Sequence, residues 1–172
     1  MKPIVLLFGL LLLTSCGTTV AVDYDKQAEF SQYTTYNYYP TISSGLSELD
    51  EQRVRTITDS LLREKGFVKA DTPQLYINFF TKEQLAVNNN TIGFGIGGGG
   101  GNVGIGVGGG IPIGGKKVEQ RLTFDFIDVV KDDLVFQVTA DGTYKERANP
   151  VQKDTYYARV ISKMLAKYPP KQ

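Results

Sequence analysis

Cys16 is the single cysteine of this 172-residue chain and its most clearly assigned reactive side chain. It follows Leu-Thr-Ser at residues 13–15, an apolar run over residues 3–13, and Lys2 in front of that run. A cationic start, a short apolar segment and small residues before a cleavage point are typical of a secretory signal peptide. The run has about eleven residues, fewer than the roughly 20 that a spanning helix needs. We therefore expect cleavage of residues 1–15; an uncleaved anchor or a buried strand is the alternative.

A cysteine directly after Leu-Thr-Ser resembles the bacterial lipoprotein pattern. In that pattern the sulfur takes a diacylglycerol and the freed amine takes a third acyl chain such as palmitate. Two chains already anchor a protein stably, so three predict firm attachment to the membrane through Cys16. By resemblance to the sorting of bacterial lipoproteins, Gly17 after the cysteine, rather than Asp, favours the outer membrane. Some bacterial lipoproteins that are exported to the cell surface carry an acidic or lysine-rich tract at this place. Residues 17–20 contain no such tract, so the resemblance favours the periplasmic face, with exposure at the cell surface as the alternative.

The sequence offers few residues that could catalyse a reaction or bind a metal ion. The chain has no histidine, which removes the commonest general base and metal ligand and makes a Ser-His triad impossible. Two acidic pairs, Asp23 with Asp25 and Asp125 with Asp128, could be calcium ligands or an acid-base pair. Neither spacing resembles a calcium loop, which takes several oxygens from one tight turn, so solvated strand carboxylates are the simpler interpretation. We expect no enzymatic activity, no metal and no cofactor.

A glycine tract over residues 93–115 contains 14 of the 19 glycines. Residues 93–98 and 104–109 both match the dinucleotide-binding pattern, but Pro112 and a strand follow where that site needs a helix. The tract alternates glycine with apolar residues. It therefore predicts a mobile loop, a β-segment that associates with a second copy or a partner, or a segment that inserts into the membrane. Its candidate contact residues are Phe94, Ile96, Ile105 and Val107.

Tyrosines gather early in the chain, and Tyr36, Tyr38 and Tyr39 are further candidates for a contact surface. Such rings could stack on sugars or bind a protein. The alternative is that some pack into the core while others shield a sheet edge.

The charge balance argues against nucleic acid as a partner. The chain has 19 basic and 18 acidic residues, and cleavage after residue 15 removes one basic residue, Lys2, so the mature charges balance. No basic excess and no polybasic run are present to supplement a lipid anchor.

The spacing of apolar residues predicts the helices and strands that position these residues. Alternation predicts strands over residues 19–25, 33–39 and 75–80, the last apolar on both faces and hence central. Residues 118–126 and 134–140 predict one hairpin, whose second strand turns Leu134, Phe136, Val138 and Ala140 inward. Helical spacing links Leu46, Leu49, Val54, Ile57 and Leu61, with Ser47 as cap and Gly66 as stop. A closing helix starts at Asn149 and carries an apolar stripe of Tyr157, Val160, Ile161, Met164, Leu165 and Tyr168.

The order β-β-α-β-β-β-α predicts an α+β fold with an antiparallel or mixed sheet and two helices on one face. Residues 16–172 are expected to form a single domain, with residues 88–117 as a glycine-rich insertion loop between strands. Because the first strand starts at Thr19, the domain is expected to sit close to the membrane rather than on a long tether.

Three segments together resemble one known family. They are residues 20–25 with 29–36, the hairpin from Asp128 to residues 134–136, and the terminal residues 164–170. They are similar to the bacterial lipoprotein family catalogued as domain of unknown function 4136, in which a glycine- and aromatic-rich insertion is familiar. The chain has no tryptophan; Tyr38 or Tyr39, and Phe136, stand where the family usually has one. The resemblance implies a shared fold and brings no catalytic residues.

These observations favour a non-enzymatic binding or scaffold module of the cell envelope, anchored to the outer membrane through Cys16. Its expected partners are the membrane and either an envelope protein or a second copy of the chain. The alternative is a carrier or sensor of a small apolar or glycan ligand held between sheet and helices.

Overall fold

The computed structural model describes residues 18–86, 91–92, 111–112 and 115–171. The predictions on the signal peptide and Cys16, and those on Phe94, Ile96, Ile105 and Val107, fall outside these residues.

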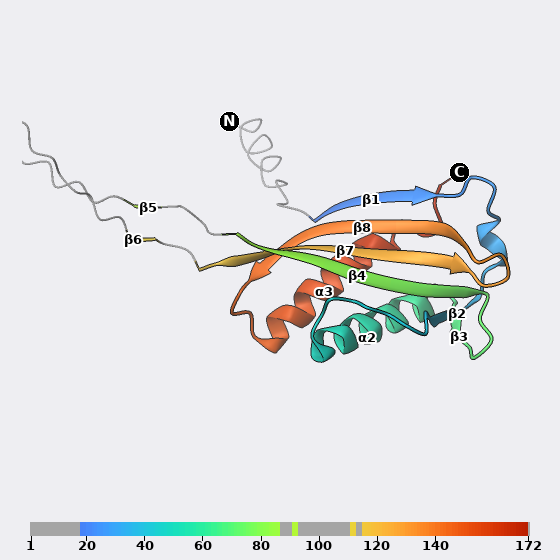
Figure 1. Cartoon of the computed structure of the whole chain (residues 1–172), viewed down its shortest axis with the longest axis horizontal. Helices are drawn as coiled ribbons and strands as arrows, with labels where there is room; N and C mark the ends of the chain where they lie inside the picture. The colour runs from blue at the N-terminus through green and yellow to red at the C-terminus, as the bar shows by residue number, and fades with distance from the viewer. Residues whose placement is uncertain (1–17, 87–90, 93–110, 113–114, 172) are drawn as a thin grey trace, which may run out of the picture.

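A six-stranded mixed sheet forms the framework, in the order β1-β8-β7-β4-β2-β3 (Figure 1). Its strands are β1 (Thr19–Tyr24), β2 (Thr35–Tyr38), β3 (Val68–Lys69), β4 (Leu75–Ala86), β7 (Lys117–Asp128) and β8 (Asp133–Lys145). The short strand β2 runs parallel to β3 and β4, and the remaining neighbours are antiparallel. The long strands β4 and β7 are central, as the apolar residues of β4 predicted.

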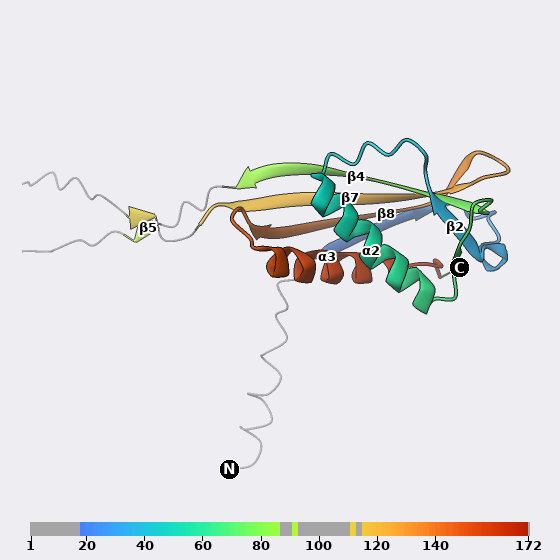
Figure 2. The ribbon, with the colours of Figure 1, turned by 90° about the horizontal axis from the view of Figure 1, so that it is seen from below.

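Two helices, α2 (Glu48–Glu64) and α3 (Pro150–Leu165), lie side by side on one face of the sheet (Figures 1 and 2). Ser47 caps α2 by accepting from the Asp50 amide. The helix ends at Glu64, and Gly66 follows its C-cap Lys65 with a φ of 88°, the left-handed conformation that glycine adopts without a Cβ clash. Asn149 and Gln152 form a capping box at the start of α3. The α+β class and the placement of both helices on one face are therefore confirmed.

The core lies between the helices and the sheet and is rich in aromatic rings. The α3 stripe is buried along its whole length, from Tyr157 at 0% exposure to Tyr168 at 2%. Tyr168 stacks on Phe126 with ring centroids 5.0 Å apart and meets Phe136 edge to face. The 3-10 turn η2 (Phe30–Gln32) adds Phe30, whose ring packs on Tyr168. Side chains therefore fill the layer in which the predicted small-ligand site was placed.

Two apolar residues lie elsewhere than predicted. A register shift between Phe126 and Ile127 adds a residue to the β7-β8 pairing, so Val135 is buried and Leu134 is 50% exposed. In α2, Leu49 is 66% exposed, because the buried face of this helix follows Asp50, Val54, Thr58 and Leu62.

The insertion starts from the ends of paired strands. Ala86 of β4 and Lys117 of β7 are the last partners in a register of twelve consecutive pairs. Within the insertion, β5 (Thr91–Ile92) pairs antiparallel with β6 (Ile111–Pro112) as a separate two-stranded sheet. The strands β3, β5 and β6 were absent from the predicted order, and β4 runs six residues past the predicted end at Phe80.

Candidate functional site

The face of the sheet turned away from the helices, hereafter the open face, is the principal candidate surface. Successive side chains of a strand point to opposite faces of the sheet. The residues that alternate with the core residues along each strand therefore belong to the open face. Its members on the three long strands are Tyr76, Asn78, Phe80, Lys82, Arg121, Thr123, Asp125, Ile127, Gln137, Thr139 and Asp141. Polar side chains dominate this set, as expected for a face that no helix covers.

Cross-strand pairs organise the open face in rows. Arg121 donates from Nε and Nη2 to the two carboxylate oxygens of Asp141, at 2.7 and 3.0 Å. In the next rows the hydroxyls of Thr123 and Thr139 lie 3.1 Å apart, and the Gln137 amide donates to Asp125 at 2.7 Å. These pairs align polar side chains in rows across β7 and β8 and so give the open face a regular pattern of charged and hydrogen-bonding groups.

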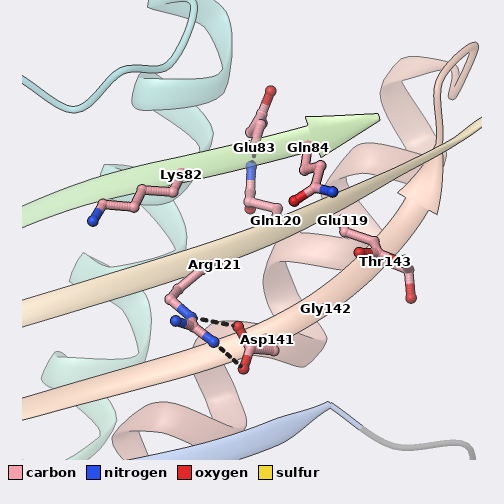
Figure 3. A pocket seen from close by; sticks show the side chains of 9 residues that line it. All are labelled: Lys82, Glu83, Gln84, Glu119, Gln120, Arg121, Asp141, Gly142 and Thr143. Carbon is pink, nitrogen blue, oxygen red and sulfur yellow. Dashed lines mark hydrogen bonds and ion pairs between the residues drawn. The ribbon is translucent and has the colours of Figure 1, made fainter. Parts of the chain in front are cut away.

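The open face is hollowed where β4, β7 and β8 run toward the insertion (Figure 3). The hollow has a volume of about 520 Å³ and is lined by Lys82, Glu83, Gln84, Glu119, Gln120, Arg121, Asp141, Gly142 and Thr143. Figure 3 shows the Arg121–Asp141 pair within it. The hydrogen bond from Arg121 lowers the pKa of Asp141. A low-pKa carboxylate already paired with a guanidinium suits charge recognition better than proton transfer near neutral pH.

A second polar cluster lies on the other side of the same strands, beneath α3. Gln120 is 1% exposed, and its amide donates to Glu83 at 2.6 Å and to the Tyr157 hydroxyl at 3.1 Å. The Tyr144 hydroxyl also donates to Glu83, at 3.0 Å. Burial, followed by the charge of Glu83, raises the pKa of Tyr144 and keeps its proton in place. Sequence reasoning missed this cluster, although Gln120 stood at an inward position of the alternating strand.

The structure separates the three tyrosines of the predicted contact surface. Tyr36 is 2% and Tyr38 is 7% exposed, and both hydroxyls donate to Asp59, at 2.8 and 2.7 Å. These two rings are therefore core residues, in agreement with the packing alternative. Tyr39 is partly exposed and meets Tyr76 of the open face edge to face, with ring centroids 5.7 Å apart.

The acidic pairs do not form a common site. Asp128 is 5% exposed and accepts from the Tyr33 hydroxyl, whereas Asp125 is held by Gln137 on the open face. Asp23 and Asp25 accept from backbone amides next to them in the chain. Within the described residues, no group of three or more acidic, histidine or cysteine side chains could hold a metal ion.

No helix in the described part of the chain has both the length and the apolar character needed to cross a bilayer. The described residues thus form an α+β domain whose mixed sheet is covered by two helices on one face and open on the other. Residues 20–170 match the model of the family described as Domain of unknown function (DUF4136), and the chain belongs to that family.

Solved structures share the fold at low sequence identity. A variant PelC dodecamer from Paraburkholderia phytofirmans matches with a TM-score of 0.53 and 17% identity, over 90% of this chain and 99% of that chain. A PDZ domain protein from Parabacteroides distasonis matches with a TM-score of 0.55 and 15% identity, over 91% of this chain and 37% of that chain. The chain thus spans about a third of the PDZ protein. No curated protein matches it.

Proposed function

We propose that this protein is a lipid-anchored, non-enzymatic binding or scaffold module of the bacterial cell envelope. Cys16 carries the lipid and attaches the mature chain to the periplasmic face of the outer membrane. The open face of the sheet receives the partner, which is an envelope protein or a second copy of the chain.

The open face is the observation that carries this proposal. Its charged and polar side chains are held in cross-strand pairs, and it is hollowed between Lys82 and Asp141. By contrast, the volume between helices and sheet is occupied by aromatic side chains, among them Phe79, Phe124 and Phe126 at 0% exposure. A partner is therefore better accommodated on the open face than in the interior.

Self-association is supported by a similar fold in an assembled protein. PelC of P. phytofirmans forms a dodecamer, and this chain covers 99% of the PelC chain. Among the strands that the structure describes, β1 is an edge strand and pairs with β8 alone. A strand with one unpaired edge can add a strand from another chain. A second copy is accordingly one of the two partners that the experiment below must distinguish.

Site-specific photocrosslinking in cells tests the proposal. A photoreactive amino acid replaces Lys82 or Thr143 on the open face, and Ser60 or Ser162 on the exposed surface of the helices serves as the matched control. We expect crosslinked products from the open-face positions and none from the helix positions. Mass spectrometry of these products separates a second copy from another protein. The absence of products at all four positions, or equal products from both surfaces, would contradict a binding role for the open face.

A glycan ligand is the second candidate, and the Tyr39–Tyr76 pair favours it. Both rings are partly exposed and lie beside Asn78, so the surface combines aromatic rings with an amide, as sugar-binding surfaces do. Titration with envelope glycans, followed by the thermal unfolding midpoint of the wild type and of Tyr76→Ala, checks this candidate. A glycan that stabilises the wild type alone would support it, and a glycan that stabilises neither would remove it.

A further inference from the structure

Three lysines from three strands lie on the half of the open face nearer the insertion. Lys117 and Lys145 are direct partners across β7 and β8. Lys82 pairs with Arg121, which lies four residues after Lys117 on the same strand. Even spacing along a strand keeps side chains on one face, so all three lysines share the open face with Arg121 and Asp141. We call Lys82, Lys117 and Lys145 the basic rim.

The basic rim is not neutralised within the described part of the chain. Its lysines are exposed and take part in none of the ion pairs found there, whereas Arg121 is paired with Asp141. Like charges directly opposite each other on a sheet destabilise it. Glu119 is exposed on the same face and offsets one charge, which leaves a net excess of positive charge at this end. An anion from outside the domain would remove the repulsion between Lys117 and Lys145.

The opposite end of the open face carries negative charge. Asp125 and Asp23 both lie in the row of Gln137, toward the β7-β8 turn. The open face is therefore polarised along its strands, basic toward the insertion and acidic toward the β7-β8 turn. A polarised face orients a domain on a charged surface, because only one end is attracted to it.

The basic rim also lies close to where the chain enters the sheet. Thr19 starts β1 and pairs with Asp141, in the same row as Arg121 and Lys82. Strand geometry places Lys145, four residues along β8 from Asp141, about 15 Å from Thr19. Thr19 lies three positions after Cys16 in the sequence, and an extended chain of that length reaches ~10 Å at most. A lipid on Cys16 therefore leaves the basic rim within reach of the surface that holds the lipid.

We propose that the basic rim binds anionic phospholipid headgroups and so sets the orientation of the domain on the membrane. This proposal rests on the lipid anchor of the proposed function. A lysine ammonium group acts as a point charge, whereas an arginine guanidinium presents its donors in a fixed planar fork. Point charges suit mobile lipid headgroups better than they suit a single ligand of fixed geometry. The sequence alone shows no polybasic run, because the three lysines come from positions far apart in the chain and only the strand register brings them together.

The test couples the unacylated mature chain, residues 16–172, to vesicles through the thiol of Cys16 and a maleimide lipid. This chemistry supplies the anchor whether or not the cell acylates Cys16. An amine-reactive reagent then labels the lysines, and mass spectrometry measures the labelling rate at each one. Vesicles of phosphatidylcholine alone are compared with vesicles that also contain phosphatidylglycerol. Lys26, Lys131 and Lys167 are exposed and distant from the basic rim, so they serve as internal controls.

We expect labelling of the basic rim to slow by about 5-fold per lysine on the anionic vesicles, and high salt to reverse the effect. The control lysines should label equally on both vesicles. In the unacylated chain with a blocked thiol, the triple variant K82Q/K117Q/K145Q should bind anionic vesicles more weakly than K26Q/K131Q/K167Q, which loses the same charge. Far-UV circular dichroism checks that both variants are folded.

Equal labelling of the basic rim on both vesicles would overturn the proposal, as would equal protection of the control lysines. Protection of the basic rim by a soluble acidic polysaccharide, at or above the level seen with vesicles, would overturn it in favour of an acidic glycan. Acylation of Cys16 is measured separately, by mass spectrometry of the full-length chain expressed with its leader. Failure there would remove the lipid anchor and leave the vesicle result standing on its own.

Discussion

The hydroxyl of Tyr33 donates a 2.6 Å hydrogen bond to the carboxylate of Asp128, across 95 residues of sequence. Asp128 ends β7 and also accepts from the backbone amides of Val130 and Lys131 in the following turn. The bond thus ties the segment before β2 to the β7-β8 turn. Burial alone would raise the pKa of Asp128, but these donors outweigh it and the pKa is lowered.

Replacing Tyr33 by Phe should destabilise the fold by about 1–3 kcal/mol, because a buried carboxylate loses a donor. Chemical denaturation at neutral pH measures this. Tyr24→Phe is the matched control: its hydroxyl makes only an exposed 3.4 Å contact to the Lys171 carbonyl, so it should change stability by less than about 0.5 kcal/mol. Equal effects of the two variants would contradict a structural role for the Tyr33–Asp128 bond.

The same bond predicts losses of stability at both extremes of pH. The lowered pKa of Asp128 contributes stability above the unfolded value of about 3.9, and this contribution is lost as the pH falls through the folded pKa. Burial, then the bond to Asp128, raises the pKa of Tyr33 to about 12. Its contribution is complete below the unfolded value of about 10 and is lost as the pH rises toward the folded one. Denaturation of Tyr33→Phe across pH should show a smaller loss at each extreme than the wild type shows.

Tyr38 should behave as a core residue. Its ring is 7% exposed, lies under the Arg55 guanidinium at 4.4 Å, and packs on Phe79. Tyr38→Ala should cost about 3–5 kcal/mol, and Tyr38→Phe about 1 kcal/mol through loss of the hydrogen bond to Asp59. Thermal and urea unfolding measure both. An alanine variant that kept full stability would favour the contact-surface interpretation instead.

Gly142 is required by a close approach. A Cβ built there would lie 2.8 Å from the Tyr156 hydroxyl oxygen, and this buried hydroxyl has no hydrogen-bond partner among the described residues. Gly142→Ala should cost about 1–3 kcal/mol. Tyr156→Phe removes the oxygen and should restore part of the loss in the double variant. Gly115→Ala, where a Cβ meets nothing within 4 Å, is the control and should be close to neutral. Absence of any rescue would show that the ring, rather than the hydroxyl, sets the constraint.

The two helices are linked by an ion pair that should be strongly coupled. Lys153 of α3 donates to Asp50 of α2, whose side chain is 7% exposed. A double-mutant cycle of Asp50→Asn and Lys153→Met should give a coupling energy of about 1–3 kcal/mol. In the pair Arg121–Asp141 the side chains are 58% and 51% exposed, so water screens their charges and the coupling energy should be clearly smaller. Equal coupling in the two cycles would contradict the role of burial.

The elements whose signals are local could be predicted from the sequence. The cap at Asn149 and the stripe from Tyr157 to Tyr168 specify α3, because capping and helical spacing depend on residues a few positions apart. The hairpin of β7 and β8 follows from alternation and a turn. The prediction that Leu134 points inward was wrong, because a β-bulge shifts the alternation by one residue. A sequence pattern does not show where a bulge falls.

The candidate surfaces could not be predicted, because they depend on pairing between distant strands. Lys117 and Lys145 become neighbours, and Lys82 joins them on the same half of the open face, only through the register of β4, β7 and β8. The amide of the buried Gln120 donates to Glu83, which lies 37 residues before it in the sequence, and to Tyr157, which lies 37 residues after it. For Tyr36 and Tyr38 the sequence left a contact surface and core packing open, because it does not show that the Asp59 carboxylate accepts from both hydroxyls inside the fold.

The pairing of Ala86 with Lys117 has a consequence for engineering the molecule. Two paired residues at the end of an antiparallel ladder are the geometry that a two-residue Asn-Gly turn closes. We therefore expect the sheet of this chain to tolerate replacement of the intervening segment by such a turn, and the same junction to accept a foreign peptide. The domain would then serve as a display scaffold in which the grafted sequence varies while the sheet that carries it stays constant.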